Sequence, residues 1–336
     1  MKNLLYIGNK LSSKGKTVTT IDTLSKALSN EGFKVKSVSN KKNKTFRLLD
    51  MLWSIIKNKN WTDYVLIDTY STQNFYYAYL SSQLCRFFKL KYLPILHGGN
   101  LPNRLHNNPK LSYAIFNYAF VNIAPSGFIA AAFIDFGFIN VSIIPNSIDL
   151  KNYNYKQRDI DIVKLLWVRS FSRIYNPNLA VDVLFKLQQK GVNSSLTMVG
   201  PDNDGSLQET KAYANALNVV INFTGKLSKK EWISLSKDKN VFINTTNFDN
   251  MPVSIIEAMA LGLPVISTNV GGIPFLIEDN VTGILVPPNN IDAFVTEILR
   301  LKENKAELED LTKEARKKVE GYNWEVVKQK WKTILK

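Results

Sequence analysis

The sequence predicts an α/β protein made of two doubly wound domains, each a parallel sheet flanked by helices. The chain has 336 residues, a length that favours two domains over one. Short β-rich apolar runs alternate with longer amphipathic stretches, which is the pattern of parallel strands joined by helical crossovers. A polar, turn-rich segment over residues 151–161 separates two such series and is interpreted as a linker. The predicted domains therefore cover residues 1–150 and 151–321.

The first series predicts six strands, each a short apolar run bounded by polar or turn residues. They are Leu4–Ile7, Lys34–Val38, Tyr64–Ile67, Tyr92–Leu96, Val121–Ala124 and Val141–Ile144. Helical patterns lie between them. One covers Thr19–Asn30, where Leu24 and Leu28 share a face, and Gly32 marks its end.

The second series repeats this alternation after residue 161. Its predicted strands are Lys164–Val168, Ser195–Val199, Val219–Phe223, Val241–Asn244, Pro264–Ser267 and Gly283–Val286. Its predicted helices are Asn178–Lys190, Leu207–Leu217, the charged Ala306–Lys318, and Trp324–Leu335 with an apolar stripe that must be buried. Because open α/β sheets bind ligands at the carboxyl ends of their strands, a cleft between two facing sheets is the expected site.

The composition excludes a disordered or fibrous chain, because 45% of the residues are apolar and only 21% are charged. The 43 Lys and Arg residues outnumber 28 Asp and Glu, and residues 1–150 alone hold 18 basic against 7 acidic side chains. This excess favours an anionic partner. It leaves three interpretations open: a nucleic-acid surface, an anionic membrane surface, or solubility alone.

Cysteine usage and hydropathy predict a cytoplasmic protein. Cys85 is the single cysteine, so no intrachain disulfide or cysteine-rich zinc site can form. The N-terminal apolar run ends at Asn9 and is too short for a secretion signal. The apolar stretches over residues 114–144 are interrupted by polar residues and predict no spanning helix, so any membrane contact would be peripheral.

Two loops of the first domain are candidate ligand contacts. Gly8–Thr17 follows a strand and contains Gly15, but Lys10 stands where a phosphate-binding loop of a nucleoside triphosphatase needs glycine. An anion contact through backbone amides and an ordinary exposed loop remain equal alternatives there. His97 ends an apolar strand before Gly98 and Gly99, where backbone can approach a ligand closely. A strand-end histidine with a purely structural role is the alternative.

A cationic turn follows the first strand of the second domain. Arg169 and Arg173 precede a helix that begins near Pro177. Two cations beside a helix N-terminus are unfavourable unless an anion lies there, and guanidinium groups suit the oxygens of a diphosphate. Gly200 and Lys226 each follow a later strand in a turn; both are candidates for a base pocket or for plain turn chemistry.

The densest signal is residues 247–274, NFDNMPVSIIEAMALGLPVISTNVGGIP. Pro252 fits the first turn of a helix and Gly262 its end. Asp249 then lies just ahead of the helix and Glu257 within it, set to contact different parts of one ligand. The backbone amides of Val253 and Ser254 would face a phosphate at the helix N-terminus.

At these residues the sequence resembles the group 1, or family four, retaining glycosyltransferases, whose GT-B fold has two Rossmann-like domains facing across a cleft. The resemblance covers nearly the whole chain and centres on the acid-x7-acid signature from Asp249 to Glu257. His97-Gly98, residues 144–149 (IPNSID) and Asn323-Trp324 match further family positions. In such proteins the last helix, here residues 322–336, packs back on the N-terminal acceptor-side domain.

The resemblance implies a role for each candidate residue. Glu257 would hold the donor ribose, Asp249 the hydroxyls of the transferred sugar, and Arg169 with Arg173 the diphosphate, making a metal ion unnecessary. His97 would lie by the sugar, so the catalytic residues would be His97, Asp249 and Arg169. The remaining donor-binding residues would be Arg173, Asn250, Val253, Ser254, Gly15, Gly200 and Lys226. This sequence departs from the family pattern at two positions. The first acid is Asp249, where the family usually has Glu. The second cation is Arg173, four residues after Arg169, whereas the family commonly has a Lys about five residues after the Arg.

The implied function is metal-independent transfer of a sugar, with retention, from a nucleotide-diphosphate sugar to a glycan or lipid-linked acceptor in cell-surface polysaccharide synthesis. No cofactor and no nucleic acid are expected; contact with the inner face of an anionic membrane remains open. One alternative is a non-catalytic polyanion or nucleic-acid binder, marked by salt-dependent oligonucleotide binding. The other is a phosphorylase or nucleotide-sugar epimerase on the same fold.

Overall fold

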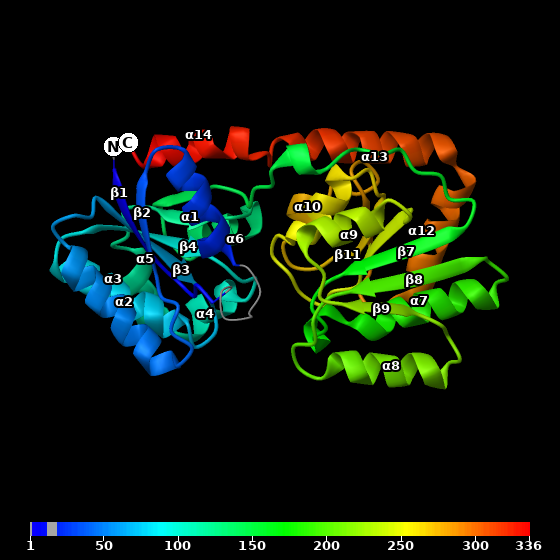
Figure 1. Ribbon diagram of the computed structural model, residues 1–336, viewed down its shortest axis with the longest axis horizontal. Coiled ribbons are helices and arrows are strands. Elements are labelled where there is room, and N and C mark those ends of the chain that lie inside the picture. The colour runs from blue at the N-terminus through cyan, green and yellow to red at the C-terminus, as the bar shows by residue number, and fades with distance from the viewer. Residues whose placement is uncertain (1, 12–18) are drawn as a thin grey trace. The chain divides into compact units, whose positions relative to one another are not determined.

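The computed structural model describes residues 2–11 and 19–336 of the chain. It divides into two compact units: Met1–Pro145 together with Lys328–Lys336, and Asn146–Val327. In its described part, each unit holds one six-stranded, all-parallel sheet with helices packed against it (Figure 1). The predicted doubly wound α/β fold is confirmed.

The first unit has the strand order β2-β1-β3-β4-β5-β6. All six predicted strands are present, with bounds within two residues of those predicted. The strands are β1 (Asn3–Ile7), β2 (Lys34–Val38), β3 (Tyr64–Thr69), β4 (Lys91–Leu96), β5 (Asn122–Ala124) and β6 (Val141–Ile143). The helices are α1 (Thr20–Asn30), α2 (Lys44–Asn58), α3 (Phe75–Phe87), α4 (Leu101–Asn107), α5 (Pro109–Phe116) and α6 (Gly127–Asp135).

The second unit has the strand order β12-β11-β10-β7-β8-β9. Its strands are β7 (Val163–Val168), β8 (Ser194–Val199), β9 (Asn222–Gly225), β10 (Val241–Asn244), β11 (Val265–Thr268) and β12 (Ile284–Val286). Its α-helices are α7 (Pro177–Gln189), α8 (Ser206–Ala216), α9 (Lys229–Ser236), α10 (Val253–Ala260), α11 (Ile273–Leu276), α12 (Ile291–Glu303) and α13 (Lys305–Glu320). Short 3-10 turns η2 (Leu150–Asn152) and η3 (Arg173–Tyr175) precede β7 and α7, and α14 (Trp324–Ile334) crosses the boundary between the units.

Strand β9 begins three residues later than the sequence predicts. Val219, the expected first strand residue, instead ends α8: its amide donates to the carbonyl of Ala214, and Asn218 adopts a positive φ of 54°. This is a Schellman motif, in which an apolar residue after the left-handed position packs back on the helix. The apolar character of Val219 therefore reflects helix termination rather than a strand.

The cores of the second unit lie on both faces of its sheet. In β7, Leu165 and Trp167 belong to the cluster with α7 and α12, whereas Leu166 belongs to the cluster with α10. Successive side chains of a strand point to opposite faces, so this central strand is apolar on both. The continuous apolar run of a parallel strand is explained by this double burial.

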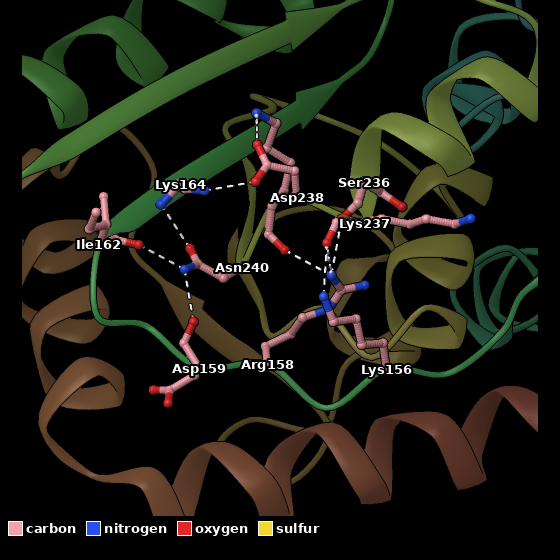
Figure 2. A network of polar contacts seen from close by, with 10 residues as sticks. Lys156, Arg158, Asp159, Ile162, Lys164, Ser236, Lys237, Asp238 and Asn240 are labelled. Atoms are coloured by element: carbon pink, nitrogen blue, oxygen red, sulfur yellow. Dashed lines mark hydrogen bonds and ion pairs between the residues drawn. The ribbon is translucent and has the colours of Figure 1, made fainter.

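The polar 151–161 segment is packed onto the second unit, so its interpretation as a simple linker is wrong. Tyr153, Arg158 and Ile160 are buried. The guanidinium of Arg158 donates to the carbonyl oxygens of Ser236 (3.1 Å), Lys237 (3.2 Å), Lys239 (3.0 Å) and Leu261 (2.9 Å). Figure 2 shows the Arg158 side chain reaching the backbone beyond α9. A polar sequence here serves to satisfy buried backbone groups.

These four carbonyls belong to the C-terminal ends of two helices and the loop after one of them. Ser236 and Lys237 end α9, and Leu261 is the C-cap of α10. A cation at a helix C-terminus is favourable because the last carbonyls carry partial negative charge. Burial lowers the pKa of Arg158 to about 10, which still leaves it charged at neutral pH. One side chain thus caps both helices.

The last residues of the chain pack within the first unit. Lys328 and Lys332 of α14 pair with Glu31, the C-cap residue of α1, at 3.1 and 2.6 Å, and the Tyr64 hydroxyl donates to the Lys336 carbonyl. A hydrogen bond from Lys332 lowers the pKa of Glu31.

In the part of the chain that the structure describes, no helix combines the length and the apolar character needed to cross a membrane.

Replacing Arg158 by alanine should lower the free energy of unfolding by about 3 kcal/mol, because four carbonyls lose a charged donor and some stay buried. Urea unfolding of the whole protein measures this change. Lys305→Ala is the matched control, since Lys305 forms an exposed ion pair with Asp159 on the same segment. The control should unfold like the wild type; an equally stable Arg158→Ala variant would contradict the capping role.

Candidate functional site

Each sheet has one topological switch point, the position where the strand order reverses. In the second unit the chain runs outward from β7 through β8 and β9, then continues with β10 on the other side of β7. In the first unit the reversal lies between β1 and β3. Ligands of open α/β sheets bind beyond the carboxyl ends of the strands at such a point. Residues that follow β7 and β10, and those that end β1 and β3, are therefore the candidates.

Arg169 and Asp249 meet at the switch point of the second unit. Arg169 directly follows β7, and Asp249 lies in the loop between β10 and α10. Their side chains form an ion pair, and the Arg169 guanidinium lies 4.0 Å from the ring centre of Tyr175. Arg169 Nε is buried and has no hydrogen-bond partner among the described residues. The pair thus keeps donor capacity that an anion could use.

The Asp249 loop is held by the turn that follows β11. The Gly272 amide donates to the Asp249 carbonyl at 2.8 Å. A Cβ atom on Gly272 would lie 2.1 Å from the carbonyl oxygen of Asn250, closer than any real contact. Glycine is required because two backbone segments meet here without a side chain between them. The NVGGIP part of the motif therefore positions the first acid.

Glu257 is buried within α10, and its carboxylate has two partners from distant parts of the chain. The Tyr153 hydroxyl donates to Glu257 Oε1 at 2.6 Å, and Lys229 forms an ion pair with the same oxygen. Burial, together with the Glu257 charge, raises the pKa of Tyr153, so its hydroxyl stays a donor. A buried carboxylate without a cation would be strongly destabilising. Lys229, the first residue of α9, supplies that cation.

The N-terminus of α10 lies between the two acids in sequence. The helix begins at Val253 with Pro252 as its N-cap, one residue later than the sequence predicts. Ser254 Oγ is buried without a partner among the described residues, and the first amides of any helix lack intrahelical acceptors. Asn250 is buried just before the helix. Ser254 thus carries an unpartnered hydroxyl among the described residues, and the amides of Val253 and Ser254 lie in the first turn of α10.

The other predicted donor-binding residues of the second unit lie around this centre in different ways. Gly200 follows β8 and has a φ of 155°. A Cβ atom there would lie 1.7 Å from the carbonyl oxygen of Arg169, so only glycine lets the loop after β8 lie this close to the loop after β7. Arg173 is exposed and pairs with Glu209 of α8 at 2.6 Å, while Arg169 pairs with Asp249. Lys226 is exposed after β9.

In the first unit, His97 belongs to a buried polar cluster at the ends of β3 and β4. Its Nε2 lies 2.8 Å from Asp68 Oδ1, which also accepts from the Tyr6 hydroxyl at 2.8 Å. The His97 ring stacks on Tyr70 with centroids 5.1 Å apart. Burial, then the Asp68 charge, raises the pKa of Tyr6 well above its ordinary value. A carboxylate oxygen can only accept hydrogen bonds, so the His97 Nε2 that contacts Asp68 Oδ1 carries a hydrogen. This hydrogen bond fixes the orientation of the His97 ring.

Asp68 Oδ2 is buried and has no partner among the described residues, and Asp68 lines a small pocket with Gly8, Asn9, Tyr70 and Asn74. This pocket lies at the β1/β3 switch point. Gly15 lies outside the described residues, so its predicted contact is not located.

Cys85 is buried in the core of this unit, and burial raises the pKa of its thiol to about 12. The thiol is therefore protonated and unreactive.

Three residues of these sites were not predicted from the sequence: Asp68, Tyr153 and Lys229. Each had a signal. Asp68 ends an otherwise apolar strand, Tyr153 is an aromatic residue in a polar segment, and Lys229 opens a helix, where a cation is unfavourable without an anion beside it. None of these signals identifies the partner, which in every case is more than 25 residues away.

Comparison with solved structures defines the class of fold. A sucrose-phosphate synthase from Thermosynechococcus elongatus superposes with a TM-score of 0.81 over 99% of this chain and 98% of that one, at 16% identity. Anabaena HepE in complex with UDP and glucose superposes at 0.80, over 100% and 99%, at 16% identity. The two α/β units together form a GT-B fold.

Residues 157–318, which make up most of the second unit, match the model of the family described as Glycosyl transferases group 1. The amylovoran biosynthesis glycosyltransferase AmsK of Erwinia amylovora is 27% identical over 54% of this chain and 46% of its own length. An Escherichia coli UDP-Gal:alpha-D-GlcNAc-diphosphoundecaprenol alpha-1,3-galactosyltransferase is 26% identical over 55% and 51%. The chain spans about half the length of the curated relatives it matches.

Replacing Gly272 by alanine should displace the Asp249–Asn250 loop and lower the free energy of unfolding by about 2 kcal/mol, as overpacking against backbone does. Denaturant unfolding with fluorescence detection measures the effect. Gly321→Ala is the control, because a Cβ there meets its nearest neighbour at an ordinary 3.4 Å and its φ of −64° suits alanine. Equal stability of the two variants would show that the turn does not hold the loop.

Proposed function

We propose that the protein is a retaining, metal-independent glycosyltransferase that moves a sugar from a nucleotide-diphosphate sugar to a glycan or lipid-linked acceptor in cell-surface polysaccharide synthesis. The observation that carries the proposal is the arrangement at the β7/β10 switch point and along α10. Arg169 is paired with Asp249 there, and Glu257 lies buried in the same helix motif. Arg169 Nε and Ser254 Oγ are unpartnered donors within this region.

Each group has a distinct task in donor binding. The Arg169 guanidinium and the first amides of α10, at Val253 and Ser254, bind the diphosphate oxygens. Glu257 accepts hydrogen bonds from the ribose hydroxyls through lone pairs that Tyr153 and Lys229 leave free. Asp249, oriented by its ion pair, accepts from hydroxyls of the transferred sugar. Asn250, Gly200, Lys226 and Arg173 complete the donor surface in this proposal.

Departure of the nucleotide diphosphate is the demanding step, because negative charge develops on its leaving oxygen. Fixed donors placed where that charge forms stabilise the transition state, usually by the largest single contribution to catalysis. Asp249 is neutralised by Arg169, which does not favour its use as a nucleophile. A front-side reaction, with the leaving phosphate accepting the acceptor's proton, is therefore the proposed route to retention.

In the first unit we assign His97 to a sugar hydroxyl and Asp68 to positioning His97. The Asp68 carboxylate holds the Nε2–H form of the ring, and the Tyr6 hydroxyl anchors the carboxylate. In the neutral form of the ring, Nδ1 is then left as an acceptor for a hydroxyl. His97 alone is the predicted sugar contact, and Asp68 acts through it.

Names of relatives support the acceptor class. They include glycosyltransferases of amylovoran and colanic acid biosynthesis, and one whose acceptor is linked to diphosphoundecaprenol. HepE has been crystallised with UDP-glucose. These properties belong to those proteins, and we extend the class of donor and acceptor to this chain.

A matching nucleotide-diphosphate sugar should raise the stability of the protein, by about 2.7 kcal/mol at 100 times its dissociation constant. Thermal-shift screening against UDP-, GDP- and ADP-sugars identifies it. Glu257→Gln should lose most of this shift and of the turnover, because the amide presents only one acceptor oxygen to the ribose. Glu314→Gln, at an exposed carboxylate on α13, is the control. A folded Glu257→Gln variant with the full shift would remove Glu257 from the site.

Transfer should continue after exhaustive treatment with EDTA, because Arg169 and the α10 amides provide the positive charge for the diphosphate. The sugar should enter the product with the anomeric configuration it has in the donor, which proton NMR of the first-formed product reports. Activity that depends on added Mg²⁺ or Mn²⁺ would contradict metal independence, and an inverted product would contradict the front-side route. Each outcome is read separately, so one can fail without the other.

A further inference from the structure

Helix α2 of the first unit is apolar on two faces, but the described protein covers only one of them. Met51 and Ile55 are buried in the core beneath the helix. On the opposite side Phe46, Leu49 and Trp53 are exposed by 65%, 56% and 62%, and Ile56 continues the same row. Spacings of three, four and three residues place these side chains on one stripe. A helix that is apolar on both sides is expected to have both sides covered.

The helix next to α2 also exposes apolar side chains. Helix α3 packs beside α2 (Figure 1) and exposes Tyr76, Leu80 and Phe87. Of the eight exposed aromatic side chains among the described residues, seven lie in the first unit and only Phe275 lies in the second. Single exposed apolar residues need no explanation, but a row of them along one helix face, as on α2, marks an interaction surface.

The same unit carries the whole positive excess of the chain. It holds 22 basic and 6 acidic side chains, a net charge of +16, whereas the second unit holds 21 and 22, a net charge of −1. Around α2 and α3, residues 41–91 include nine basic and three acidic side chains. The three acids are engaged: Asp50 with Ser39, Asp63 with Asn3 and Asp68 with His97. Lys41, Lys42, Lys44, Lys57 and Lys59 flank the apolar stripe.

We propose that the outer face of α2 docks the protein on a bilayer containing anionic lipid, with Phe46, Leu49 and Trp53 inserted at the headgroup level. Aromatic and leucine side chains between flanking lysines are the composition of helices that lie in this interface. The lysine stems reach past the stripe while their charges meet lipid phosphates. A second copy of the chain is disfavoured as the occupant, since two surfaces of the same strong charge would repel.

This inference rests on the proposed function in one respect: a transferase with a lipid-linked acceptor must work at a membrane surface. Docking through α2 adds which face contacts the lipid and which lipid class it prefers. Because vesicle binding needs neither donor nor acceptor, it can be measured on the full chain alone. Failure of docking with a normal donor-induced thermal shift would overturn this inference and leave the proposed function standing.

The test is cosedimentation of the full chain with vesicles of phosphatidylcholine and with vesicles of equal parts phosphatidylcholine and phosphatidylglycerol. The wild type should bind the anionic vesicles, and raising the ionic strength to about 1 M, where the Debye length is about 3 Å, should weaken this binding. Leu49→Gln with Trp53→Gln should reduce the partition coefficient about tenfold or more. Lys42→Glu with Lys57→Glu should reduce binding only to anionic vesicles.

The matched control exchanges two more exposed apolar residues elsewhere, Ile139→Gln with Val220→Gln, which are 97% and 88% exposed. It should bind like the wild type. Equal binding by the α2 variant and the wild type, or no binding by the wild type, would overturn the proposal. So would a wild type that dimerises in light scattering, ignores vesicles and becomes monomeric when the α2 stripe is changed, since the face would then join two copies.

Discussion

The guanidinium of Arg158 joins the C-terminal ends of the two helices of the second unit that carry Lys229 and Glu257. It donates to carbonyl groups at the C-terminal ends of α9 and α10 and is itself buried in a segment that the sequence presents as polar and unstructured. Each helix also carries a charged site residue: Lys229 is the first residue of α9, and Glu257 lies one turn before Leu261 in α10. Because Arg158 holds the ends of both helices, it also helps to fix the distance between Lys229 and Glu257. A structural contact outside the site thus contributes to the geometry of the site.

The site in turn depends on neutralising two carboxylates, one of them buried (Glu257) and one partly buried (Asp249). Asp249 is paired with Arg169 and Glu257 with Lys229, so the protein without ligand satisfies its own charges. Hydrogen-bonding capacity remains on the carboxylate oxygens, on Arg169 Nε and on Ser254 Oγ. An anionic, hydroxyl-rich ligand fits this pattern because it brings acceptors to the free donors and hydroxyls to the acids. Preorganised charge of this kind needs no rearrangement at the moment of reaction.

The sequence predicted the sheets, because parallel strands such as β7 are apolar on both faces and stand out as continuous runs. It also predicted the Asp249–Glu257 motif, whose spacing relative to Pro252 and Gly262 is local. It missed Tyr153, Lys229 and Asp68, because their roles come from partners brought together only by the fold. It misread residues 151–161 and Val219 because burial there comes from helix ends, which hydrophobic periodicity does not report.

A crystal structure of the protein with its nucleotide-diphosphate sugar would test most directly whether the donor binds at the β7/β10 switch point and along α10. The ribose hydroxyls should then donate to Glu257, and the diphosphate should lie against Arg169 and the first amides of α10. The base and sugar should extend to either side of the carboxyl ends of β7 and β10. A nucleotide bound away from this switch point, with Arg169–Asp249 and Lys229–Glu257 untouched, would contradict the assignment of the site.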